Sequence, residues 1–161
     1  MLTLLVRAAV WLAAFLVCAS LEKPAGLSFT DLRPGPPGWI GVALISAGAV
    51  LLLWSMLWLD RIIQDPAAPQ TLLVTSGPYG YVRNPLYLAG AIVGVGIATL
   101  YAPWSLAKAG RAILVALLVH AAVVRLEEPR TRGRLGPIYE EYCRRVPRWI
   151  PGLKPSRPGT W

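Results

Sequence analysis

Four long apolar runs alternate along the chain with polar segments rich in proline and glycine. The apolar runs cover residues 2–21, 39–59, 86–101 and 104–126. About 20 apolar residues are enough for a helix to cross the hydrocarbon core of a membrane. The pattern therefore predicts an all-α, polytopic membrane protein with about four transmembrane helices in the single domain 1–161.

Two of these runs need separate comment. The first run ends on the small residues Ala19 and Ser20, so a cleaved signal peptide is an alternative to an uncleaved helix. The uncleaved helix is preferred because further apolar runs follow. The third run carries Gly90, Gly94 and Gly96, whose spacing lets membrane helices approach closely. Since few residues separate the third and fourth runs, we expect them to form a helical hairpin.

Composition supports the membrane assignment. Of 161 residues, 55% are hydrophobic and only 15% are charged, against roughly 25% charged in an ordinary soluble domain. These values exclude an ordinary soluble domain and an intrinsically disordered chain. The two cysteines, Cys18 and Cys143, form neither a disulfide framework nor a metal-ligand pattern.

The net charge of +8 is concentrated near the C-terminus, where residues 125–157 hold nine Lys or Arg and four Glu. A basic tail that follows an apolar run suits an anionic membrane surface better than a nucleic acid, so no nucleic-acid partner is expected. The positive-inside rule places this tail in the cytoplasm. Four crossings then place the N-terminus there too, and bring the polar segments 60–85 and 127–161 to the same membrane face.

Hydrogen-bonding and aromatic side chains are dense in residues 75–87, where the third apolar run begins. Pro85 suits the first position of a helix, where its missing N–H is not needed. Backbone N–H groups at such a helix start can bind an anionic group. The alternative to a binding site is that the Tyr and Arg side chains of residues 75–87 simply lie at the membrane–water interface.

Three further features are candidates for chemistry. The adjacent Glu127 and Glu128 are either ordinary helix-terminal charge or a functional pair that needs a cationic partner. His120 lies within an apolar run. It is either a functional group or a neutral histidine that forms a hydrogen bond to a neighbouring helix. A single His without Cys, Asp or Glu at ligand spacing predicts no metal site. Residues 139–151 suit an amphipathic segment on the membrane surface or a clamp over a ligand.

Taken together and in their order along the chain, residues 75–87, Glu127-Glu128 and residues 139–151 resemble motifs of a known family. This family is the integral-membrane methyltransferases related to isoprenylcysteine carboxyl methyltransferase and the phospholipid methyltransferases. The resemblance covers about residues 60–151. Its motifs are 73–79, Arg83-Asn84-Pro85-Leu86-Tyr87, Glu127-Glu128, 136–142 and Val146-Pro147-Arg148.

This resemblance implies S-adenosylmethionine as cofactor and a lipid or lipid-linked methyl acceptor. The residues it implies for catalysis are Glu127, Arg83 and Tyr87. Those it implies for the cofactor are Gln64, Thr71, Leu72, Leu73, Val74, Tyr79, Asn84, Pro85, Leu86, Tyr87 and Glu127. Weaker substrate candidates are His120, Glu128, Tyr142 and Arg148.

Two positions depart from the family pattern. Asn84 stands where a histidine is common, so no titrating acid or base is available at that place. Val123 stands four residues before Glu127, where the isoprenylcysteine branch has an arginine that meets its substrate. The acceptor, a carboxylate or an amine, and the oligomeric state therefore stay open. An NADPH-dependent sterol-type reductase and a non-catalytic membrane scaffold are the alternative functions.

Overall fold

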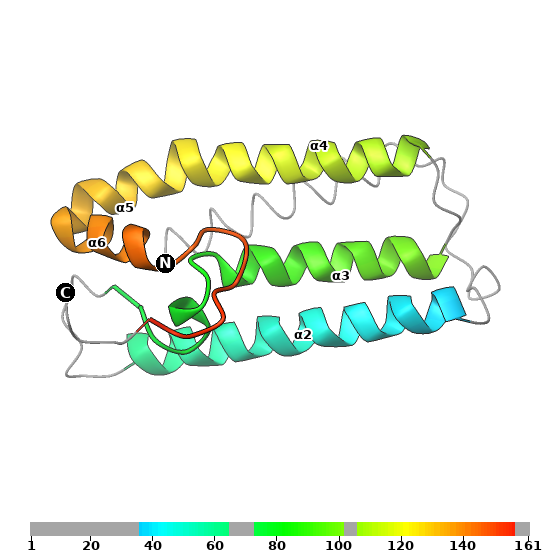
Figure 1. Ribbon diagram of the computed structural model, residues 1–161, viewed down its shortest axis with the longest axis horizontal. Helices are drawn as coiled ribbons and strands as arrows, with labels where there is room; N and C mark the ends of the chain where they lie inside the picture. The colour runs from blue at the N-terminus through cyan, green and yellow to red at the C-terminus, as the bar shows by residue number, and fades with distance from the viewer. Residues whose placement is uncertain (1–35, 65–72, 102–105, 157–161) are drawn as a thin grey trace.

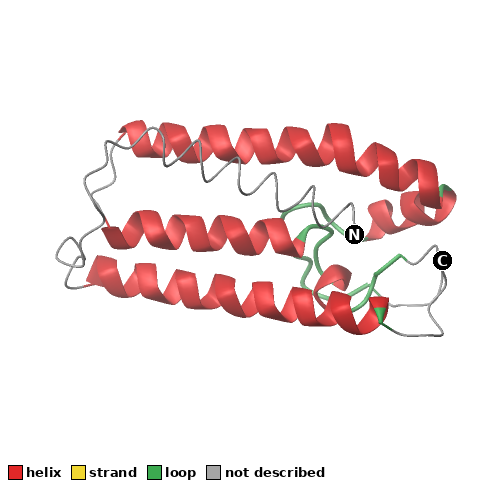
Figure 2. Ribbon diagram, turned by 180° about the vertical axis from the view of Figure 1, so that it is seen from behind, coloured by secondary structure: helices red, strands yellow, loops and turns green. Residues whose placement is uncertain are grey.

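The computed structural model describes residues 36–64, 73–101 and 106–156, and this part of the chain is helical, without strands. The all-α prediction is thereby confirmed for these residues. The predicted membrane helix 2–21, with the signal-peptide alternative, lies outside them. Three long helices lie side by side with alternating direction, and the short elements gather at one end (Figures 1 and 2).

The long helices are α2 (Pro36–Ile63), α3 (Pro85–Tyr101) and α4 (Leu106–Ala122). α2 has 28 residues, so it is about 42 Å long at 1.5 Å per residue. It is long and apolar enough to cross a membrane, by length and composition, whereas α3 is apolar but shorter. Large apolar side chains of α2 are exposed, such as Val50 at 66% and Leu53 at 59%, and suit contact with lipid.

The closest helix packing joins α2 to α3, and glycines make it possible. A Cβ on Gly48 would lie 2.9 Å from the carbonyl oxygen of Ala89, and one on Gly41 equally close to that of Gly96. Of the third run's glycines, Gly96 serves this contact, while a Cβ on Gly94 would meet nothing within 4 Å. α4 runs back along α3, as a hairpin requires (Figure 1), but the glycine-mediated contact is with α2.

The fourth apolar run does not end its helix at residue 126. α4 continues through the π-helical turn η3 (Val123–Glu127) into α5 (Glu128–Leu135). Gly136, at φ +54°, then turns the chain into α6 (Pro137–Arg145). The apolar pattern hid this extension because the added turns are polar and basic.

A single-turn helix, η2 (Gly77–Gly80), sits on the polar end of α2. The Trp58 indole N–H donates to the Ser76 hydroxyl at 3.1 Å, and Gly77, at φ +59°, lies against the Trp58 ring where a Cβ would clash at 2.6 Å. These contacts fix the loop that leads into α3, and the predicted start of that helix at Pro85 is observed.

Candidate active site

The start of α3, the π turn, α6 and the strap, which we define as residues 146–156, meet at one end of the helices (Figure 1). The strap pairs with the loop before α3 through backbone hydrogen bonds. The Arg83 N–H donates to the Pro147 carbonyl at 2.9 Å, and the Gly152 N–H donates to Tyr81 at 2.8 Å. Segments more than 60 residues apart in sequence are thus held together.

The π turn allows two consecutive glutamates to reach this end of the molecule. Its hydrogen bond runs from the Glu128 N–H to the Val123 carbonyl, five residues back. Because the turn holds one residue more than an α turn, the buried face passes from Val119 and Val123 to Glu128, not to Glu127. Such π turns are frequent at functional sites.

Glu127 pairs with Tyr87, the two residues on which the enzyme interpretation most depends. The Tyr87 hydroxyl donates to the Glu127 carboxylate at 2.6 Å. Tyr87 is 2% exposed and packs with Val119 and Val123. The residue pair predicted to face one site is therefore in direct contact, joining the first turn of α3 to the π turn.

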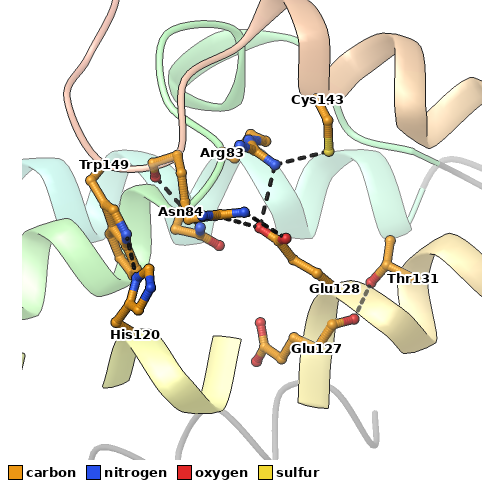
Figure 3. A network of polar contacts seen from close by, with 9 residues as sticks. Arg83, Asn84, His120, Glu127, Glu128, Thr131, Cys143 and Trp149 are labelled. Atoms are coloured by element: carbon orange, nitrogen blue, oxygen red, sulfur yellow. Dashed lines mark hydrogen bonds and ion pairs between the residues drawn. The ribbon is translucent and has the colours of Figure 1, made fainter. Parts of the chain in front are cut away.

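Glu128 holds two arginines from different segments (Figure 3). Arg148 of the strap grips its carboxylate with two hydrogen bonds, of 2.7 and 2.8 Å, while Arg83 Nη1 lies at 3.3 Å. The Glu128 side chain is 7% exposed, and those of Arg83 and Arg148 are 12% and 30% exposed. The hydrogen bonds that Arg148 donates to the Glu128 carboxylate raise the pKa of Arg148, so its guanidinium stays charged.

One face of α6 completes this cluster. Arg83 Nη1 also donates to the Cys143 sulfur at 2.9 Å, and the buried Tyr142 hydroxyl donates to the Tyr79 carbonyl at 2.8 Å. Burial raises the pKa of Tyr142 and of Tyr139. Both phenols are therefore neutral hydrogen-bonding groups at physiological pH.

His120 of α4 lies on the other side of the strap. The Trp149 indole N–H donates to His120 Nδ1 at 3.1 Å, and the two rings lie 6.0 Å apart. Nearby, the Asn84 amide reaches the Arg148 carbonyl at 3.5 Å, a weak contact by length. Figure 3 shows these contacts beside the Glu128 cluster.

The remaining predicted cofactor residues lie in different places. Thr71 and Leu72 lie outside the described residues, and Gln64 is exposed just after α2. Leu73 packs against the tyrosines of α6. The residues that line the loop and the first turn of α3, where the site gathers, are Tyr79, Asn84, Pro85, Leu86 and Tyr87, with Val74 half-buried before them.

The structure adds two side chains that the sequence does not single out as site residues, Trp149 and Cys143. It also places Glu128, a weak substrate candidate from the sequence, at the centre of the arginine contacts. Tyr139, Tyr142 and Cys143 have the spacing of residues on one face of a helix. This spacing is the sequence signal that could have identified Cys143. Nothing in the sequence identifies Trp149 as the partner of His120, because the two lie 29 residues apart.

Comparisons with known proteins agree with the motifs. The model of the phospholipid methyltransferase family matches residues 37–137. The cobalt-zinc-cadmium resistance protein CzcN of Cupriavidus metallidurans is 35% identical over 127 residues, which make up 77% of this chain and 52% of that protein. The nickel-cobalt-cadmium resistance protein NccN of Alcaligenes xylosoxydans xylosoxydans is 33% identical over 124 residues, 71% of this chain and 53% of that protein.

The chain thus spans about half the length of these curated relatives. No solved structure matches. The family match covers the start of α3 and the π turn, and with them both Tyr87 and Glu127, and it confirms the resemblance drawn from the motifs. The chain belongs to the phospholipid methyltransferase family.

Proposed function

We propose that this protein is an S-adenosylmethionine-dependent methyltransferase that acts on a lipophilic or lipid-linked acceptor at the membrane. Family membership supports membrane methyl transfer in general. The observation that carries the finer proposal is the 2.6 Å contact between Tyr87 and Glu127. It joins the two family motifs at the start of one helix and in the π turn of another.

The residues present fit this cofactor chemically. Its sulfonium is a cation, and an aromatic side chain beside a carboxylate, as in Tyr87 and Glu127, stabilises a cation where water is scarce. Its carboxylate is an anion, and Arg83 has a buried Nε–H without a partner among the residues described. When bound, the cofactor supplies an electrophilic methyl group.

The protein's own contribution is alignment and exclusion of water. Tyr87 orients the Glu127 carboxylate, and the strap closes the polar side of the site through Arg148. An acceptor carboxylate needs only orientation, whereas an acceptor amine must lose a proton, which Glu127 could take. Asn84 offers hydrogen bonds to either acceptor but no titrating group.

The membrane arrangement is part of the same proposal. Four crossings would place both termini and the segments 60–85 and 127–161 in the cytoplasm. The cofactor would then enter from the cytoplasm and the acceptor sideways from the bilayer. The exposed apolar faces of α2 and α4, such as Leu53 and Leu117 at 59% and 60% exposure, support contact with lipid.

The printed names of the two relatives connect them with resistance to cobalt and cadmium. Among the residues that the structure describes, no three of His, Cys, Asp and Glu come close enough together to hold a metal ion. Because the chain belongs to a methyltransferase family, we propose that any role it has in metal resistance proceeds through methylation of a membrane component.

Cofactor binding by the full chain, purified in detergent, tests the proposed function. Isothermal titration should show binding of S-adenosylmethionine and of S-adenosylhomocysteine. Exchanging both Tyr87→Phe and Glu127→Gln should weaken binding about tenfold or more, the value of a lost hydrogen bond to a charged group. Glu140→Gln, in the exposed pair with Arg132, is the matched control.

The outcomes of this titration distinguish the methyltransferase from the two alternative functions. Wild-type protein that binds NADPH instead would favour the reductase alternative. Protein that binds neither ligand would favour the scaffold. Undiminished binding of S-adenosylmethionine by the double variant would refute the proposed cofactor site at Tyr87 and Glu127.

A further inference from the structure

The strap contacts α4 and α2, the helices on either side of α3 (Figures 1 and 2). At α4, the Trp149 indole N–H donates to His120 at 3.1 Å. Near α2, the Gly152 N–H donates to the Tyr81 carbonyl at 2.8 Å, and the Tyr81 ring lies 6.5 Å from the ring of Trp54. The strap therefore crosses from one helix to the other past the start of α3.

Both contacts lie within the apolar runs and not at their polar ends. Trp54 precedes Asp60, the first charged residue of α2, by six positions, about 9 Å along the helix axis. His120 precedes Arg125 by five positions, about 7 Å. Since the headgroup region on each side of a bilayer is about 5–8 Å thick, these contacts lie at the boundary between headgroups and acyl chains.

The exposed side chains of the strap suit this depth. Leu153 is 100% exposed and Ile150 is 80% exposed. They project from a backbone that the amides of Gly152 and Ser156 tie to the loop before α3. Large apolar side chains held in this way are unfavourable in water and favourable against acyl chains. Lys154, exposed beside Leu153, supplies a charge for anionic headgroups.

The backbone of the strap also suits a place with little water. Pro147, Pro151 and Pro155 have no N–H group, and the amides of Gly152 and Ser156 have carbonyl partners. Proline at every fourth position thus removes donors that lipid would leave unsatisfied.

We propose that the strap is inserted in the membrane interface, with Ile150 and Leu153 against the acyl chains of the surrounding lipid. This refines the proposed topology, because the strap then lies in the membrane surface while α5 and α6 extend beyond it. Trp149, the neighbour of Ile150, packs against Tyr87, so a lipid-linked acceptor meets the site at the strap. That meaning for catalysis rests on the proposed function, whereas the insertion does not.

Spin labels on single cysteines test the insertion in the full chain, held in nanodiscs of phosphatidylcholine and phosphatidylglycerol. Ile150→Cys and Leu153→Cys carry the label in a background with Cys18→Ala and Cys143→Ser. Collisions with oxygen, which concentrates in lipid, are compared with collisions with a water-soluble nickel chelate.

Two labelled positions provide the references for lipid and water. Leu117→Cys, at a position 60% exposed within the apolar run of α4, is the lipid reference. Ile138→Cys, at a position 47% exposed in the first turn of α6, is the water reference. Both strap labels should collide with oxygen as the Leu117 label does, and should lose the nickel collisions that the Ile138 label shows.

Hydrogen exchange of protein that keeps both native cysteines gives a second measurement in the same nanodiscs. Leu153→Ser should lower the protection of the Gly152 and Ser156 amides about tenfold or more, the value of one leucine side chain lost from an apolar environment. Ile138→Ser removes an exposed apolar side chain outside the interface and should leave this protection unchanged.

The inference is overturned if the strap labels are as accessible to nickel as the Ile138 label, or if Leu153→Ser leaves the protection unchanged. Labels shielded from both reagents, with dipolar broadening between copies, would also overturn it, because a second copy of the chain would then cover the strap. Failure of the proposed function would be seen separately, as an inserted strap in a protein that does not bind S-adenosylmethionine.

Discussion

Replacing Glu128 by Gln tests whether the buried carboxylate organises the polar end of the molecule. The change removes a charge that forms two hydrogen bonds to Arg148 and one contact to Arg83. It leaves two guanidiniums facing each other, of which Arg83 is only 12% exposed. Removing one partner of a buried ion pair typically destabilises a protein by 3–5 kcal/mol.

The lower end of that range applies here because Arg148 is 30% exposed, so water can solvate its guanidinium when the ion pair with Glu128 is lost. We therefore expect a loss of about 3 kcal/mol in unfolding free energy. For a chain of this size, that corresponds to a fall in Tm of about 6–12 °C. Thermal unfolding of detergent-purified protein, followed by far-UV circular dichroism, measures the change.

Glu140→Gln provides the comparison, because Glu140 is also a glutamate paired with an arginine. Its contact with Arg132 is 3.8 Å long, and both side chains are more than half exposed. An exposed pair of this kind contributes at most about 1 kcal/mol. A Tm shift for Glu128→Gln no larger than that for Glu140→Gln would refute the reasoning that burial makes the Glu128 cluster important.

Three further predictions concern packing and pH. Gly48→Ala should destabilise the protein by about 1–3 kcal/mol because its Cβ has no room, whereas Gly94→Ala, in open space, should not; thermal unfolding of both variants gives the difference. Gly77→Ala should lower Tm and change Trp fluorescence, since it combines a positive φ with a clash against Trp58; an unchanged Tm would contradict this. Burial raises the pKa of Tyr142, so the unfolded chain releases this proton first, and stability should fall above about pH 10 by up to about 1.4 kcal/mol per pH unit. Tyr142→Phe should show a shallower alkaline loss in a pH series of unfolding curves.

Two features of the site were accessible from the sequence, one from local chemistry and one from the resemblance to the family. Pro85 marks the start of α3 since proline is tolerated in the first turn. That Tyr87 and Glu127 belong to one site is implied by the resemblance to the family; their direct hydrogen bond is a finding of the structure. These features needed no knowledge of helix register.

Other features depend on contacts that no local pattern encodes. The few polar residues of the run 104–126, such as Lys108, Arg111 and His120, follow no period that reveals the π turn, which places Glu128 on the buried face. The resemblance to the family assigns catalysis to Glu127 and only a weak substrate role to Glu128. The contact between His120 and Trp149 depends on how the strap crosses the helices, which hydrophobic patterning does not determine.

The π turn also determines how the molecule tolerates changes in length. The turn holds one residue more than an α turn, and this extra residue brings Glu128 instead of Glu127 to the buried face after Val123. Deleting one residue between Val123 and Glu128 would let an ordinary α turn form, with Glu128 four residues after Val123 and still on the face that meets Arg83 and Arg148. A single-residue deletion in α5 has no such extra residue to remove, and would rotate the part of the basic arm that follows by about 100°. Alignments of relatives across this turn must therefore allow for one residue more or less to compare the two glutamates correctly.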